Sequence, residues 1–270
     1  MARRPAIVSR TLAPVSRIAF IAIIGLHDAG IVLSAPEGDS RVSIITGNLV
    51  SWHTAVFVFG LVLAAVRGIP QQMAALRQGR WQTMLGVTLR GRTLGILGYG
   101  RIGATVAGYG KAFGMNVLTW GREGSIERAR ADGIETVDGK EVLFEQSDVL
   151  SVHLRSNKST QGLITAADLA RMKPASLFVN TSRAAIVEPG ALEAALRNGR
   201  PGSAAVDVYE EEPVLGGNHP LLKMDNVIVS SHVASASPTA ARKLRETAAN
   251  LALAALNGEP LSNIVNGVCR

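Results

Sequence analysis

The sequence predicts an α/β fold built on a doubly wound parallel sheet, and two observations carry this prediction. Beyond residue 92, short apolar runs alternate with helical patterns, which is typical of β-α-β units. Several of these runs are apolar almost throughout, as strands covered on both faces are. The expected strands are Thr93–Leu97, Asn116–Trp120, Val149–Leu154, Ser176–Asn180, Ser203–Val208 and Asn226–Ser230.

The segments between these strands carry start and stop signals of helices. Thr165 and Asp168 form a capping pair ahead of an apolar helical pattern, and Pro174 ends that helix. Gly199 ends the next one in the same way that glycine ends many helices. Helices are expected at about 101–113, 169–172, 191–198 and 238–256.

A glycine-rich loop follows the first expected strand and opens the first expected helix. Gly98, Gly100 and Gly103 form the pattern G-x-G-x-x-G. In this context Gly98 permits a tight turn, Gly100 lets the backbone approach a pyrophosphate, and Gly103 allows close helix–strand packing. The helix N-terminus adds amide donors and a positive dipole end for the phosphates. The pattern predicts a Rossmann dinucleotide-binding domain, with a purely structural glycine turn as the alternative.

The end of the second strand indicates which dinucleotide is bound. An acid at this place holds the ribose 2′-hydroxyl of NAD, but here the strand ends in Trp120-Gly121-Arg122. Without a carboxylate a 2′-phosphate is not repelled, and a guanidinium binds phosphate in bidentate fashion. NADP(H) is therefore favoured. NAD(H) stays possible if Glu123 serves the ribose and Arg122 is a solvated loop residue.

Charged side chains follow three neighbouring expected strands. Arg183 comes after the fourth strand, the acidic run Glu210–Glu212 after the fifth, and His232 after the sixth. Because ligands of open α/β sheets bind beyond the carboxyl ends of the strands, these groups should converge where a nicotinamide would lie. Taken singly, each has a plainer interpretation as a surface charge or a buried histidine.

Charge and cysteine content bear on partners and location. The formal charge is +7, and residues 1–92 hold ten of the 28 Lys and Arg but only three of the 21 Asp and Glu. Aromatic residues are 4% of the chain, which is poor for base stacking, so we expect no nucleic-acid partner. The one cysteine, Cys269, argues for a reducing, cytoplasmic compartment and against a cysteine metal site. The apolar run Thr54–Val66 is shorter than the roughly 20 residues of a membrane span, so we expect no membrane partner.

The motifs, taken in order, resemble the D-isomer-specific 2-hydroxyacid dehydrogenases, which include phosphoglycerate dehydrogenase and glyoxylate/hydroxypyruvate reductases. The match runs from about residue 88 to 236, with a weaker extension through Leu61–Trp81. It is carried by Leu89-Arg-Gly-Arg-Thr-Leu-Gly-Ile, the glycine loop, Asp148-Val-Leu-Ser-Val-His-Leu, Met172-Lys-Pro with Val179-Asn-Thr-Ser-Arg183, Ala205-Val-Asp-Val-Tyr-Glu-Glu-Glu-Pro213, and Ser231-His232.

The resemblance implies an oxidoreductase that moves a hydride between NAD(P)H and a small 2-keto or D-2-hydroxy acid. Its catalytic set would be Arg183, Glu212 and His232. In chemical terms, His232 can give a proton to the developing alkoxide, Glu212 can orient the imidazolium, and Arg183 can bind the substrate carboxylate. The implied cofactor-binding residues are Gly98, Tyr99, Gly100, Arg101, Ile102, Gly103, Gly121, Arg122, Val152, His153, Thr181, Ser182 and Asp207; no metal is expected.

The resemblance also implies two domains and a homodimer. The cofactor domain would span residues 85–236, and a smaller, incomplete α/β substrate domain would combine residues 1–84 with 237–270. The family's Ala-Glu pair corresponds here to Ala55-Val56, and the glycine loop that offers amides to the substrate carboxylate has no counterpart. This eroded, basic N-terminal region supports an alternative function, a dinucleotide-binding regulator or corepressor without turnover.

Overall fold

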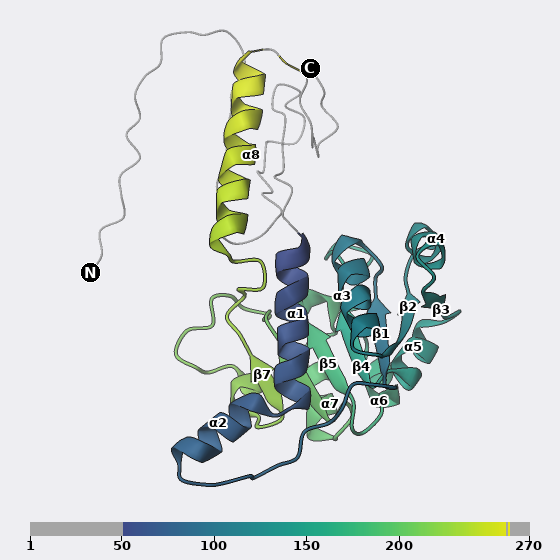
Figure 1. Cartoon of the computed structure of the whole chain (residues 1–270), viewed down its shortest axis with the longest axis vertical. Coiled ribbons are helices and arrows are strands. Elements are labelled where there is room, and N and C mark those ends of the chain that lie inside the picture. Colours follow the sequence, from purple (N-terminus) through teal and green to yellow (C-terminus); the bar gives the residue numbers. More distant parts are fainter. Residues whose placement is uncertain (1–50, 258, 260–270) are drawn as a thin grey trace, which may run out of the picture. The chain divides into compact units, whose positions relative to one another are not determined.

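The computed structural model describes residues 51–257 and Glu259. The chain divides into two compact units, residues 50–237 and the two chain ends at 1–49 and 238–270. The first unit holds a seven-stranded parallel sheet flanked by helices, which confirms the predicted doubly wound α/β fold (Figure 1). In the second unit the described part is mainly helix α8 (Pro238–Leu256). Residues 1–50 of the expected substrate domain lie outside the described residues.

The expected strands and helices form with small differences at their ends, and β3 is an additional two-residue strand. The strands are β1 (Thr93–Leu97), β2 (Asn116–Trp120), β3 (Glu135–Thr136), β4 (Val149–Val152), β5 (Leu177–Asn180), β6 (Ser203–Val206) and β7 (Val227–Val229). The helices of the first unit are α1 (Ser51–Val66), α2 (Ile69–Arg77), α3 (Arg101–Ala112), α4 (Glu123–Ala131), α5 (Lys140–Gln146), α6 (Ala166–Arg171) and α7 (Ala191–Arg197), with short 3-10 turns η1 (Ala184–Ile186) and η2 (Pro220–Lys223).

The strand order places a reversal of direction beside the glycine loop. The order across the sheet is β3-β2-β1-β4-β5-β6-β7, so the chain winds to one side of β1 and then to the other. Leu97, the last residue of β1, pairs with Trp120 of β2 and with Val152 of β4. These three strands therefore end at one level. A crevice beyond such a reversal is where open α/β sheets bind their ligands.

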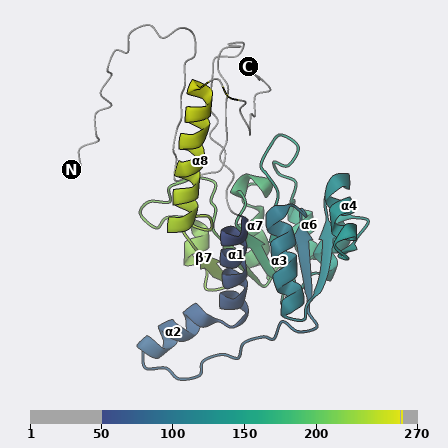
Figure 2. The same cartoon turned by 45° about the horizontal axis from the view of Figure 1, so that its top comes forward.

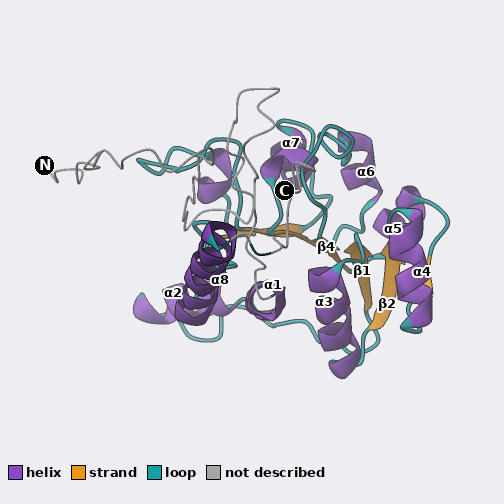
Figure 3. Ribbon diagram, turned by 90° about the horizontal axis from the view of Figure 1, so that it is seen from above, coloured by secondary structure: helices purple, strands orange, loops and turns teal. Residues whose placement is uncertain are grey.

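Helices cover both faces of the sheet (Figure 3). On one face α1 and α3 lie side by side (Figure 2), and Val58 and Val106 are buried in the same cluster as Ile96 of β1. On the other face α5, α6 and α7 pack around Phe144 and Phe178, both fully buried. Burial on both faces explains why the strands read as almost continuous apolar runs.

Helix α1 packs on the sheet, and the compact unit that contains it spans residues 50–237, a wider range than the 85–236 expected for the cofactor domain. Its buried residues Ala55, Val58, Phe59 and Val62 have helical spacing and form one apolar stripe. This stripe contacts α3 and strands β5 to β7. Burying it on the sheet removes apolar surface from water, and this favours residues 51–66 as part of the cofactor unit.

The length and apolar character of the described helices bear on whether any of them could span a membrane. No single one of them is long and apolar enough to cross a membrane. Helices α1 and α2 meet the criterion only as a pair, bent by 56° at the break between them.

Candidate active site

The carboxyl edge of the sheet gathers the three residues expected to do chemistry. Arg183 lies three residues beyond β5, and Glu212 and His232 follow β6 and β7. Since β5, β6 and β7 are consecutive neighbours in the parallel sheet, the segments after them emerge at one edge. The structure brings all three segments together, as the sequence predicts.

Glu212 and His232 form a close pair. His232 Nδ1 lies 2.6 Å from Glu212 Oε2, and the other carboxylate oxygen accepts a hydrogen bond of 2.9 Å from the Tyr209 backbone N–H. The carboxylate is thus fixed from one side and holds the imidazole from the other. The backbone of His232 has a φ of 56°, which is uncommon for a residue other than glycine and indicates a constrained position. With Nδ1 directed at Glu212, Nε2 is the ring nitrogen that can exchange a proton with a substrate.

Asp207 holds the segment that carries His232. Its side chain is fully buried, and its carboxylate accepts hydrogen bonds from the backbone N–H groups of Val233 (3.0 Å) and Ala234 (2.8 Å) and from the Ser230 hydroxyl. A buried carboxylate with several donors is well compensated for its loss of water. These contacts make Asp207 the anchor of the histidine segment, and the cofactor contact expected for it stays a prediction.

Arg183 lies in a tight turn at the end of β5. The Asn180 side chain accepts from the Ser182 N–H at 3.0 Å and donates to the Arg183 carbonyl at 3.0 Å, which closes the turn. The guanidinium donates to the Ser182 carbonyl. Burial lowers the pKa of Arg183, and the negative charge of Glu212 opposes that shift. The arginine and the glutamate therefore belong to one electrostatic cluster with His232.

The glycine loop has the shape that a pyrophosphate needs. Gly98 has a φ of 99°, and a Cβ there would lie 2.9 Å from the carbonyl oxygen of His153. A Cβ at Gly103 would lie 2.4 Å from the Gly98 carbonyl oxygen. At Gly100, by contrast, a Cβ would meet no atom within 4 Å, so the loop is open on that side. Closed packing at two glycines and open space at the third, ahead of the α3 N-terminus, fit a bound dinucleotide phosphate.

The residues beside the glycines differ in orientation. Tyr99 is buried, and it donates its backbone N–H to the Ser125 hydroxyl and its own hydroxyl to Asp132, so its side chain packs inside; its cofactor contact stays a prediction. Burial and the neighbouring Asp132 raise the pKa of Tyr99 to about 12. Arg101 is exposed at the first position of α3, and Ile102 is half-buried against the core.

The end of β2 lies against the glycine loop. A Cβ at Gly121 would lie 3.7 Å from the Cα of Gly98. Arg122 follows, exposed, at the position that caps α4, and Glu123 is exposed in the first turn of that helix. Arg122, the expected partner of a 2′-phosphate, and Glu123, the alternative partner of the ribose, therefore both lie just beyond the end of β2.

The remaining predicted cofactor residues line the ends of β4 and β5. Val152 is buried, and its carbonyl accepts from the Ser182 hydroxyl at 2.7 Å, which ties the two strand ends together. Thr181 is buried next to Ser182. Burial lowers the pKa of His153 to about 4, and its Nε2 is buried with no hydrogen-bond partner among the described residues. His153 is therefore uncharged near neutral pH.

Two residues at the site had no signal in the sequence. Ser125 accepts the Tyr99 N–H and contacts the end of β2, and Ser230 donates to Asp207 while its carbonyl accepts from the Tyr209 hydroxyl. A serine after a strand or inside a helix is too common to stand out. Among the residues that the structure describes, no cluster of histidine, cysteine and acidic side chains could hold a metal ion.

Comparison with known proteins places these features in a family. Residues 59–234 match the family model described as "D-isomer specific 2-hydroxyacid dehydrogenase, NAD binding domain". A glyoxylate reductase from Aeropyrum pernix is 41% identical over 230 residues, which are 82% of this chain and 68% of that protein.

Solved structures agree. A structure from Ralstonia solanacearum, provisionally assigned as a D-3-phosphoglycerate dehydrogenase, superposes with a TM-score of 0.78 at 48% identity and covers 84% of this chain and 69% of its own. A D-isomer specific 2-hydroxyacid dehydrogenase from Xanthobacter autotrophicus Py2, in complex with NADPH and MES, superposes with a TM-score of 0.66 at 31% identity, over 82% and 92% of the two chains. The chain belongs to the D-isomer specific 2-hydroxyacid dehydrogenase family, the NAD(P)-dependent oxidoreductases of small 2-hydroxy and 2-keto acids.

Proposed function

We propose that this chain reduces a small 2-keto acid to the D-2-hydroxy acid and prefers NADPH over NADH. The observation that carries the catalytic proposal is the pair of His232 and Glu212, 2.6 Å apart, beside Arg183 at the carboxyl edge of the sheet. When bound, the nicotinamide supplies the hydride. The side chains must then supply a proton, orient the acid and hold the substrate.

His232 is the proton donor in this proposal. Its Nε2 gives a proton to the oxygen that becomes the alkoxide, while Nδ1–H stays hydrogen-bonded to Glu212. The carboxylate fixes the plane of the ring and leaves Nε2 as the nitrogen directed away from Glu212. Glu212 is itself held by the Tyr209 N–H, and the histidine segment is held by Asp207. Such preorganisation means that little rearrangement is needed when the proton moves.

Arg183 holds the substrate. A guanidinium binds a carboxylate in bidentate fashion and places a positive charge next to the adjacent carbonyl oxygen, where negative charge develops. Burial of Arg183 strengthens this interaction, because the water that would screen it is partly excluded.

The preference for NADPH rests on Gly121 and Arg122 at the end of β2. In dinucleotide-binding sheets the ribose 2′ position would be held at this strand end, where exposed Arg122 follows Gly121. A 2′-phosphate gains a charged partner from Arg122 and meets no carboxylate at residue 121. Exposed Glu123 is the feature that would favour NADH instead.

The test is turnover of NADPH, and separately of NADH, with glyoxylate, hydroxypyruvate and longer 2-keto acids. In His232→Ala turnover should fall by roughly 10²–10⁴-fold, because the general acid is lost. His219→Ala is the matched control: His219 pairs with Glu210 at 2.9 Å on the same segment, and this variant should keep most of the activity. Undiminished turnover in His232→Ala would contradict the assignment.

The same experiment separates enzyme from regulator. Tight NADPH binding by the wild type without turnover of any 2-keto acid would favour a dinucleotide-binding regulator or corepressor. A binding protein has little need for an acid–base pair such as His232 and Glu212, which the Tyr209 N–H holds in place, so this pair supports the enzyme.

We further propose that the active protein is a homodimer. Apolar side chains gather, exposed, on α2 and on the extended segment after it, among them Ile69, Met73, Leu76, Trp81 and Leu85. The first three recur at positions i, i+4 and i+7 and so form one stripe of α2. An exposed apolar stripe of this kind marks an interaction surface, and a second copy of the chain is the partner that we propose.

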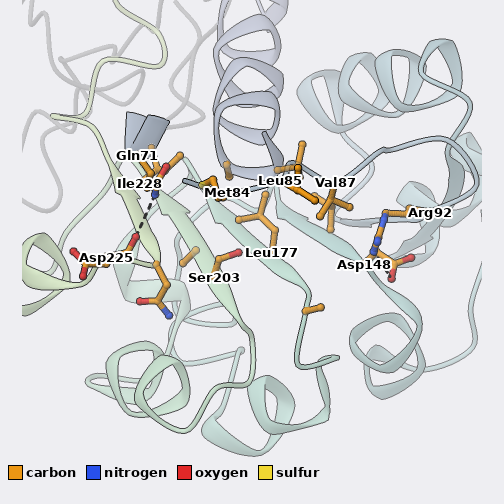
Figure 4. A pocket seen from close by; sticks show the side chains of 16 residues that line it. Gln71, Met84, Leu85, Val87, Arg92, Asp148, Leu177, Ser203, Asp225 and Ile228 are labelled. Atoms are coloured by element: carbon orange, nitrogen blue, oxygen red, sulfur yellow. Dashed lines mark hydrogen bonds and ion pairs between the residues drawn. The ribbon is translucent and has the colours of Figure 1, made fainter. Parts of the chain in front are cut away.

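Next to this stripe the segment covers a pocket of about 290 Å³ at the amino ends of the strands. Figure 4 shows Met84, Leu85 and Val87 above Leu177, with Ile228 beside Gln71. The pocket lies at the sheet edge opposite to His232, so a partner bound there would leave the active site accessible.

Two further proposals rest on the sequence. Residues 1–50 and 238–270 would complete the substrate domain. Residues 51–84 would belong to the cofactor unit, because α1 within them packs on its sheet. The cytoplasmic location follows from the single cysteine and stays a prediction.

A further inference from the structure

A positively charged loop follows β4 at the reversal of the sheet order. Residues 155–160 contain Arg155 and Lys158, both exposed, and no acidic residue. The carbonyl of Arg155 is hydrogen-bonded, but within the described part of the chain its guanidinium has no hydrogen-bond or ion-pair partner. Arg128 and Arg197, by contrast, are bound to Tyr99 and Glu193. The charge of Arg155 is thus available to a ligand.

The backbone of this loop is fixed. The Thr160 hydroxyl, in a residue only 5% exposed, donates to the Arg155 carbonyl at 2.6 Å and accepts from the Asn157 N–H at 2.9 Å. The Asn157 side chain in turn accepts from the Ser159 N–H at 2.9 Å. Arg155 therefore projects from a defined position, which lowers the entropic cost of using its side chain for binding.

Arg155 and Arg122 lie on either side of the glycine loop. Trp120 and Val152 both pair with Leu97, so β2 and β4 end level with each other on the two sides of β1. Arg122 is two residues beyond this line and Arg155 three. Neighbouring strands are about 4.8 Å apart, so the ends of β2 and β4 are separated by roughly 10 Å, a gap that two arginine side chains can close from both sides.

Contacts of the glycine loop show that the end of β4 is adjacent to that loop. A Cβ at Gly98 would lie 2.7 Å from the side chain of Leu154, the residue before Arg155. The pyrophosphate is served by the loop's own amides and the α3 N-terminus. Exposed arginines on both sides are therefore placed for a further anionic group at the adenosine end.

We propose that Arg155 is a second specificity-determining residue, which binds from the β4 side the same 2′-phosphate that Arg122 binds from the β2 side. This inference rests on the proposed preference for NADPH. A phosphate monoester has enough oxygens for two guanidinium forks, and each charge-assisted pair adds affinity that a 2′-hydroxyl cannot receive.

The test measures binding without catalysis. Calorimetric titration of the full chain with 2′,5′-ADP and with 5′-AMP isolates the 2′-phosphate. In Arg155→Ala the affinity for 2′,5′-ADP should fall by roughly 10–100-fold, the usual range for a charged hydrogen bond, with a change below about twofold for 5′-AMP. Arg155→Lys should retain part of the affinity. The control Arg197→Ala removes an exposed arginine of α7 that pairs with Glu193, and it should change neither titration.

The outcomes are distinguishable. If the wild type binds both nucleotides equally, the preference for NADPH is wrong and the inference falls with it. If the wild type prefers 2′,5′-ADP but Arg155→Ala leaves that preference intact, only the role of Arg155 is wrong. Equal losses for both nucleotides would place Arg155 on the adenine or the 5′-phosphate and also overturn the inference.

Discussion

Two glycines of the phosphate loop are required for different reasons. At Gly103 the space for a side chain is already taken, since a Cβ would lie 2.4 Å from the Gly98 carbonyl oxygen. At Gly100 the space is empty, and a methyl group would extend into the volume proposed for the pyrophosphate. Gly103 is therefore required by the packing of the fold, and Gly100 by the proposed ligand.

This difference predicts opposite behaviour of two alanine variants. Gly103→Ala should lower the free energy of unfolding by about 1–3 kcal/mol, because the helix must move away from the loop. Gly100→Ala should cost less, about 0.5–1 kcal/mol, because glycine is preferred over alanine at a helix N-cap, yet lose most of its affinity for NADPH. Urea unfolding and NADPH fluorescence titration measure the two effects. A Gly100→Ala variant that binds like the wild type would mean that the phosphate lies elsewhere.

At this scale the sequence indicates which residues stand at the site but not what each one touches. Arg183, Glu212 and His232 could be placed because each follows a strand and parallel strands end at one edge. The partners of Tyr99 and Asp207 could not. Both depend on segments 26–33 positions away, which the fold alone brings into contact.

Among the helices, α6 shows how a local sequence signal also joins two elements. Thr165 and Asp168 form the reciprocal capping box that their spacing predicts. Asp168 additionally accepts from Lys140 Nζ of α5 at 2.7 Å, in a pair whose side chains are 15% and 6% exposed. Burial opposes ionisation, but the hydrogen bonds from Lys140 and Thr165 outweigh it and lower the pKa of Asp168.

A pH dependence of stability follows from that lowered pKa. A carboxyl group whose folded pKa is depressed stabilises the protein above its unfolded pKa, about 3.9, and the contribution is lost as the pH falls through the folded value. Asp168→Asn should therefore lower the free energy of unfolding by about 1–3 kcal/mol at pH 7, and the difference from the wild type should shrink below about pH 4.

Urea unfolding at several pH values measures this difference. Glu193→Gln is the control, because its pair with Arg197 is an exposed i,i+4 contact on α7 worth about 0.5 kcal/mol at most. A gap between wild type and Asp168→Asn that stays constant down to pH 3 would show that the carboxylate charge has no part in it.

The strands of the cofactor unit were predictable because each is an apolar run, and the segments between them carry clear start and stop signals of helices. β3 was not, since two residues, Glu135 and Thr136, carry no periodicity. The position of α1 was also missed. Its apolar stripe fits any buried surface, and only the assembled sheet provides the face on which it packs.

At the scale of the whole molecule, the exposed apolar residues are unevenly distributed. Large hydrophobic side chains are exposed mainly between residues 52 and 87, on α1, on α2 and in the segment leading to β1. The carboxyl edge, where Arg183, Glu212 and His232 lie, belongs to the other end of the strands. An exposed apolar stripe away from the edge that carries Arg183, Glu212 and His232 supports the proposed assembly.

The homodimer proposal makes a direct prediction. Met73→Glu and Leu76→Glu place a charge in the middle of the stripe of α2, and burying it at an interface without a partner is costly, so both variants should be monomeric at concentrations where the wild type is dimeric. Light scattering after size-exclusion chromatography measures the mass, and a cooperative thermal transition shows that the monomer is folded. Leu215→Glu, a change of a more exposed leucine in a loop outside this stripe, should stay dimeric. A wild type that is monomeric at all concentrations would remove the second copy as the partner of this stripe and leave α2 to bind a different protein surface.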